Sequence, residues 1–162
     1  MKEKKDSKAA KTAGKVTMKA GKIIRAYRLL NIERTEKKEG FKLSALEAND
    51  LYIVIRALDA LKPVVDKFDG FVKDAQKKLK PEGWDEKVQK YQDASTEEKA
   101  EIDKEAEEYT RKVNECVSTE LEKDKEIEAY EHLSEEAFGK LVQTNDHLLN
   151  VPEIMLLREI LA

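Results

Sequence analysis

The sequence is poor in glycine and proline, with six Gly and three Pro among 162 residues. An all-β fold needs these residues at its many turns, so the composition disfavours such a fold. The single cysteine, Cys116, excludes an internal disulfide framework and is typical of a reducing compartment. No apolar run approaches the roughly 20 residues of a membrane-spanning helix, and no apolar stretch follows the basic N-terminus as in a secretory signal. We therefore expect a soluble intracellular protein that has no membrane partner.

The motifs that commonly carry catalysis or cofactor binding are also missing. The glycine-rich phosphate-binding motifs GxGxxG and GxxxxGK[ST] are both absent, and there is no GxSxG nucleophile elbow. His132 and His147 lack the glutamate three positions earlier that di-iron sites in helical bundles use. Cys116 could pair with a histidine, but it lies at a predicted packing position, which favours a buried structural thiol. We expect no catalytic, cofactor-binding or metal-binding residues, and an enzyme with an unrecognised site is the least favoured alternative.

Charge is abundant and unevenly distributed. Charged residues make up 40% of the chain. Hydrophobic residues also make up 40%, which is too much for a simply disordered acidic protein. Residues 1–26 hold nine Lys and Arg against Glu3 and Asp6, a net charge of +7, which leaves −10 for the remainder. Such a basic end suggests contact with a polyanion or with an acidic protein surface. We expect residues 1–15 to be a flexible tail, and its candidate polyanion contacts are Lys2, Lys4, Lys5, Lys8, Lys11 and Lys15.

Apolar residues between 51 and 79 recur at alternate spacings of three and four, which is the coiled-coil heptad pattern of one long amphipathic helix. The nine positions of this seam are Leu51, Val54, Leu58, Leu61, Val65, Phe68, Val72, Ala75 and Leu79. A capping-box sequence at Ser44 and Glu47 predicts that the helix begins there. Pro63 lies opposite the seam, where a kink would bend the helix around its partner.

A second helical segment follows a clear break in the pattern. Residues 80–83 read Lys-Pro-Glu-Gly and interrupt the first helix, and a capping-box sequence at Ser95 and Glu98 predicts a new start. The same spacing then continues at Trp84, Val88, Tyr91, Ile102, Ala106, Tyr109, Val113 and Cys116. We predict a mainly α fold built on a long antiparallel helical hairpin over residues 44–123.

Short segments at either end of the hairpin add a small β element to the predicted fold. Residues 16–18 and 41–43 are candidate extended segments, and residues 125–133 alternate as a strand does. Ser134 and Asn150 precede two further helices. We therefore expect one domain over residues 16–162, with a strand and helix segment at 125–162.

The last predicted helix is apolar over most of its surface rather than along one stripe. A terminal helix covered on one side by its own domain would leave part of this surface exposed, and exposed apolar patches often mark interfaces. We expect at least part of it to contact another chain, and the candidate partner-binding residues are Leu156, Leu157, Ile160 and Leu161.

The order of these segments resembles a group of small, uncharacterised proteins encoded by phages and prophages, often near tail genes. The resemblance covers about residues 16–162, and it is carried by KIIRAYRLL, FKLSALEANDLYIVIRALDALKPVVDKFDGFV, KEIEAYEHLSEE and LNVPEIMLLREIL. It implies a phage or mobile-element origin, and hence a place in the cytoplasm of a bacterial host or in a virion. It transfers no functional residue.

Together these patterns favour a non-enzymatic protein that acts by protein–protein interaction or assembly, with a protein partner or a second copy of itself. The alternative is a nucleic-acid-associated protein that uses its Lys-rich tail. Salt-sensitive retention on DNA would distinguish the two.

Overall fold

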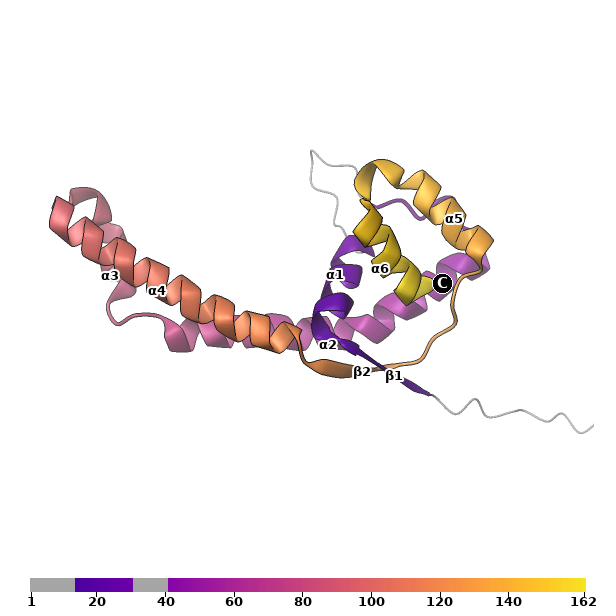
Figure 1. Cartoon of the computed structure of the whole chain (residues 1–162), viewed down its shortest axis with the longest axis horizontal. Coiled ribbons are helices and arrows are strands. Elements are labelled where there is room, and N and C mark those ends of the chain that lie inside the picture. The colour runs from indigo at the N-terminus through magenta and orange to yellow at the C-terminus, as the bar shows by residue number, and fades with distance from the viewer. Residues whose placement is uncertain (1–13, 31–40) are drawn as a thin grey trace, which may run out of the picture.

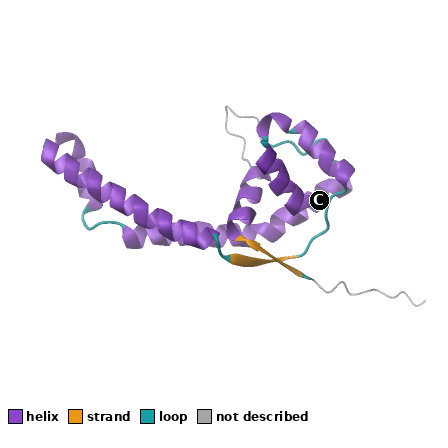
Figure 2. Ribbon diagram, in the orientation of Figure 1, coloured by secondary structure: helices purple, strands orange, loops and turns teal. Residues whose placement is uncertain are grey.

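The computed structural model describes residues 14–30 and 41–162, and helices dominate both stretches (Figure 2). Figure 1 shows a long helical hairpin that projects from a cluster of shorter helices beside a small antiparallel sheet. The predicted mainly α fold with a hairpin and a minor β element is confirmed. The elements in chain order are β1 (Lys15–Lys19), α1 (Ala20–Leu30), α2 (Ala48–Leu79), α3 (Trp84–Lys90), η1 (Tyr91–Asp93), α4 (Thr96–Leu121), β2 (Asp124–Glu128), α5 (Glu135–Thr144), η2 (Asp146–Leu148) and α6 (Val151–Leu161).

The long helix α2 carries the predicted apolar seam. Five of its nine positions are buried, namely Val54, Leu61, Val65, Phe68 and Ala75. The other four are half-buried. Pro63 lies on an exposed side of α2, and the helix continues through it.

The seam packs on two different partners, whereas the predicted hairpin over residues 44–123 would pair the whole seam with the second helical segment. Its first part, around Val54 and Leu61, is buried by α1, α5 and α6 in the main core. Only from Val65 onward does α4 contribute, through Val117 and Leu121. The reason is the offset of the two helices, because Tyr109, midway along α4, contacts Gln76 near the end of α2, and the first half of α4 packs on α3 instead.

Of the two capping boxes predicted for the hairpin, one forms. Glu98 N donates to Ser95 Oγ at 3.3 Å, and Ser95 N donates to Glu98 Oε2 at 2.8 Å, so α4 begins as expected. The prediction at Ser44 is wrong, because α2 begins only at Ala48 and the residues before it form a turn. Equivalent local sequences therefore start one helix and not the other.

The β element is an antiparallel pair in which Val16 of β1 lies opposite Ile127 of β2. Ile127 is buried in the main hydrophobic core, as its position in the alternating stretch requires. The strand is shorter than residues 125–133, because the chain leaves the pair after Glu128 and runs towards α5 (Figure 1). Residues 41–43 form no strand.

The predicted tail and the structure overlap only at its end. Lys15 belongs to β1, although the sequence placed it in the tail. Residues 1–13 and 31–40 lie outside the described residues, so the flexible tail stays a prediction.

Candidate partner-binding surfaces

The C-terminal helix α6 does not offer the surface that the sequence predicted. Three of its four candidate residues are 0% exposed within the chain's own core: Leu157, Ile160 and Leu161. Their assignment as partner-binding residues is wrong, because the chain's own core encloses this helix and includes these apolar side chains. Leu156, the fourth candidate, is half-buried. The solvent instead reaches Val151, 69% exposed, and Met155, 67% exposed.

The described part of the basic N-terminal stretch is largely paired with carboxylates of the same chain. Its ion pairs are Lys15 with Glu126 at 2.9 Å, Lys19 with Asp124 at 3.1 Å and Lys22 with Glu159 at 2.6 Å. The hydrogen bond with Glu126 raises the pKa of Lys15 above its ordinary value. Of the six candidate polyanion contacts only Lys15 is described, and its charge is already balanced; Lys2, Lys4, Lys5, Lys8 and Lys11 lie outside the described residues.

We call residues 69–118 the arm and the other described residues the head. Within the arm, all of which is described, Ala75 is the single buried residue. The apolar side chains between its helices are only half-buried, because two helices cannot enclose a seam as a larger bundle does. The arm therefore adds little to the core of the molecule.

Polar and aromatic contacts hold the tip of the arm together. The rings of Trp84 and Tyr109 lie 6.1 Å apart, and Tyr109 Oη donates to the carbonyl of Gln76 on α2 at 3.1 Å. Lys87 on α3 pairs with Glu105 on α4 at 2.8 Å. Trp84 thus packs against α4 close to the turn of the hairpin.

The α4 side of the arm is acidic, whereas residues 69–95 carry six Asp and Glu and six Lys. Helix α4 carries nine Asp and Glu against four Lys and Arg, a net charge of −5. The capping hydrogen bonds from Ser95 lower the pKa of Glu98, so this carboxylate keeps its charge at lower pH. A surface of this kind attracts cations and repels phosphate backbones.

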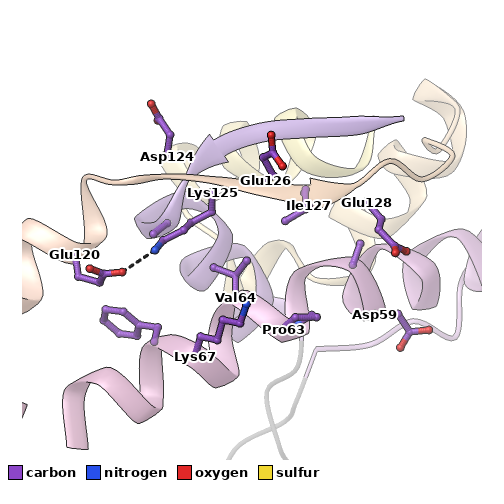
Figure 3. Close-up of a pocket in the computed structure, with 13 residues that line it drawn as sticks. Asp59, Pro63, Val64, Lys67, Glu120, Asp124, Lys125, Glu126, Ile127 and Glu128 are labelled. Atoms are coloured by element: carbon purple, nitrogen blue, oxygen red, sulfur yellow. Dashed lines mark hydrogen bonds and ion pairs between the residues drawn. The ribbon is translucent and has the colours of Figure 1, made fainter. Parts of the chain in front are cut away.

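A pocket of about 590 Å³ lies at the base of the arm, where α2, the end of α4 and β2 meet (Figure 3). Helix α2 provides an apolar wall made of Ala60, Pro63, Val64 and Phe68, and β2 lines the opposite side along its whole length. Carboxylates outnumber lysines around it: Asp59, Glu120, Asp124, Glu126 and Glu128 against Lys67 and Lys125. The sequence did not single out this set, because only the tertiary structure brings the three elements together.

The two ends of the pocket differ in charge balance. Glu120, only 12% exposed, binds Lys123 at 2.6 Å and Lys125 at 2.7 Å, and hydrogen bonds from these two lysines lower its pKa. Asp59 on α2 and Glu128 on β2 both lie at the opposite end (Figure 3), and neither forms an ion pair with another described residue. The carboxylate on the arm side of the pocket is therefore neutralised by lysines, whereas the far side keeps a negative charge.

Other reactive side chains are scattered through the described residues. Cys116 is a half-buried free thiol rather than a fully buried one. His132 Nδ1 lies 2.8 Å from the carbonyl of Ala162, far along the chain from Cys116. Within the described residues, no three His, Cys, Asp or Glu side chains gather as metal ligands. Nor does any helix of residues 14–30 and 41–162 combine the length and apolar character that crossing a bilayer requires.

Comparison of the chain with protein-family models, with curated proteins and with solved structures finds no match.

Proposed function

We propose that this chain is a non-enzymatic protein that acts by protein–protein interaction or assembly, and that its arm contacts the partner. The observation that carries the proposal is the arm itself, which extends away from the head (Figure 1) and holds one buried residue, Ala75. An element that buries little apolar surface adds little to the stability of its own fold. Its length is better explained by contact with something outside the chain.

The acidic α4 side of the arm favours a partner with a basic face. Complementary charge speeds association and excludes partners of like charge. The half-buried apolar seam adds a surface that a third helix could cover, in the way helices complete a bundle. Residues 16–162 also resemble phage-encoded proteins, so we extend the proposal to a phage or mobile-element origin.

The alternative function, nucleic-acid binding through the Lys-rich tail, receives less support from the described residues. Lys15, Lys19 and Lys22 are paired with carboxylates, and releasing them for phosphate contacts would leave those carboxylates unpaired. The net charge of −5 on α4 would also repel a nucleic acid that approached the arm.

Charge reversal on the arm tests the proposal. The full chain and a variant carrying Glu101→Arg and Glu107→Arg would be immobilised and incubated with lysate of the source cells, followed by quantitative mass spectrometry. We expect specific proteins to be captured by the wild type and lost by the arm variant, by about tenfold or more.

A matched control carries two charge reversals on the head, Glu136→Arg and Asp146→Arg, and should capture the same proteins as the wild type. A DNA column run at low and high salt supplies the second comparison. Capture that is indifferent to the arm charges, together with salt-sensitive retention on DNA, would contradict the proposal and favour the alternative.

A further inference from the structure

The hydrogen bonds at the ends of the β1–β2 pair reveal which backbone groups of β2 are used. Ala20 N donates to Lys123 O at 2.9 Å, and Ala129 N donates to Gly14 O at 2.8 Å. Hydrogen-bonded positions alternate along an antiparallel pair. Every second residue of β2, counted from these ends, therefore directs its backbone groups towards β1.

By this alternation Lys125 and Ile127 are the residues of β2 whose N–H and C=O groups face β1. The backbone groups of the other three residues point to the opposite edge, and these are Asp124, Glu126 and Glu128. Figure 3 shows β2 running between β1 and α2, so this outer edge borders the pocket. Within the described residues no third strand pairs with it.

The wall across from this edge is suited to the side chains of an extended segment. Ala60 and Val64 provide apolar contacts on α2. Pro63 has no amide hydrogen, so it cannot form the helical bond to the carbonyl of Asp59 one turn earlier. That carbonyl is left without its helical donor, and the Asp59 and Glu128 carboxylates are oxygen acceptors at the same end of the pocket (Figure 3). An ammonium or guanidinium group has only donors and needs such a set.

Strand β1 shows which sequence complements β2. On the outer face of the pair, basic or hydroxyl side chains of β1 lie opposite the acids of β2: Lys15 opposite Glu128, Thr17 opposite Glu126 and Lys19 opposite Asp124. The residue between the last two, Met18, packs towards the core. The complement of β2 is thus an extended segment with basic residues at alternate positions and apolar residues between them.

A second copy of β2 is a poor occupant of this edge. Two such strands side by side would place the carboxylates of Asp124, Glu126 and Glu128 against one another, and like charges opposite each other destabilise a pair. Acidic side chains along an open edge are a known device against self-pairing.

We propose that the outer edge of β2 binds an extended segment of a partner protein, with Lys or Arg at alternate positions and apolar residues between them. The segment adds a third strand to the sheet, its apolar side chains contact the α2 wall, and one cation reaches Asp59 and Glu128. This inference rests on the proposed interaction role, and it gives the chain a second binding surface besides the arm.

A proline substitution isolates the backbone contribution. Because the amide of Glu126 faces away from β1, Glu126→Pro removes an outward donor and leaves the β1 ladder intact. Glu126→Ala is its matched control, since it removes the same carboxylate and keeps the amide. The probe is a fluorescent heptapeptide of alternating lysine and valine, and a peptide of alternating glutamate and valine is the negative control.

We expect the lysine peptide to bind the full wild-type chain in an anisotropy titration, and Glu126→Pro to weaken binding by about tenfold, well beyond the effect of Glu126→Ala. Circular dichroism checks that the proline variant is folded. If it is not, the pair Asp59→Asn and Glu128→Gln replaces it, and the same tenfold loss is expected from removal of the cation contact. Equal binding of both peptides, equal binding by both Glu126 variants, or no binding by the wild type would overturn the inference.

Two further measurements distinguish this inference from self-association and from the proposed function of the arm. Polymerisation of the chain that Glu126→Pro abolishes would make a second copy the occupant and overturn the partner-segment proposal. The arm variant with Glu101→Arg and Glu107→Arg should bind the lysine peptide as the wild type does. Arm-dependent capture from lysate without peptide binding would overturn the inference about the β2 edge and leave the proposed function of the arm standing. Peptide binding without arm-dependent capture would overturn the proposed function of the arm and leave the inference about the β2 edge standing.

Discussion

Asn145 joins two parts of the head that are distant in the sequence. It is fully buried, and its Oδ1 accepts from Lys42 N at 2.6 Å while its Nδ2 donates to the carbonyls of Lys42 and Leu141, each at 2.8 Å. Every polar atom of this side chain is thereby satisfied, as burial requires. The segment before α2 is thus fixed to the end of α5 by this one residue.

Leu157 provides the residue-scale test of the corrected assignment of α6. Because this side chain is 0% exposed, Leu157→Ala should lower the free energy of unfolding by about 2–5 kcal/mol, the range seen for buried leucines. Met155→Ala, on the exposed side of the same helix, should cost less than about 0.5 kcal/mol. Urea unfolding of both variants measures the difference. Equal, small losses for both variants would mean that Leu157 is exposed rather than buried.

Tyr130 predicts a loss of stability at high pH. Its hydroxyl donates to the carbonyl of Ile160 at 2.9 Å, and burial raises its pKa from 10.0 to about 12. Between these values the unfolded chain gives up the phenolic proton first, so the contribution of Tyr130 is complete below pH 10 and is lost as the pH rises towards 12. Chemical unfolding at several pH values should therefore show a steeper decline for the wild type than for Tyr130→Phe. Parallel declines would mean that Tyr130 ionises equally in both states.

At the scale of elements, the two capping-box sequences make a matched pair. Ser95→Ala removes the side-chain acceptor at the start of α4 and should destabilise the protein by about 0.5–2 kcal/mol. Ser44→Ala should change the stability by less than about 0.5 kcal/mol, because Ser44 caps no helix. Thermal unfolding of the two variants is the measurement. A larger effect at Ser44 would show that α2 begins where the sequence alone suggests.

For the whole molecule, the contrast between arm and head predicts uneven protection against hydrogen exchange. Amides in α3 and the first half of α4 have few buried neighbours, whereas α1 and α6 lie in the core. Local opening should therefore release the arm at a lower free energy than the head. Mass spectrometry of exchanged, digested protein should show deuterium entering residues 84–110 well before residues 151–161. Uniform uptake would mean that arm and head unfold as one unit.

Local sequence patterns were enough to locate most of the helices and their apolar faces. The seam from Leu51 to Leu79, the break at residues 80–83 and the cap at Ser95 are local features, since each depends on residues a few positions apart. The alternation around Ile127 likewise announced β2.

What covers each apolar face depends on contacts between segments that are distant in the sequence. Periodicity shows that a face is buried but not by what, so the all-round apolar surface of α6 fits an enclosed core helix as well as an interface helix. The same holds for the seam, where Val54 meets the head and Val65 meets α4. The pocket beside β2 depends on α2, α4 and β2 meeting, and the start of α2 follows a segment held by Asn145, 103 residues beyond Lys42. Such long-range contacts are set by the packing of the whole chain, which no local window of sequence contains.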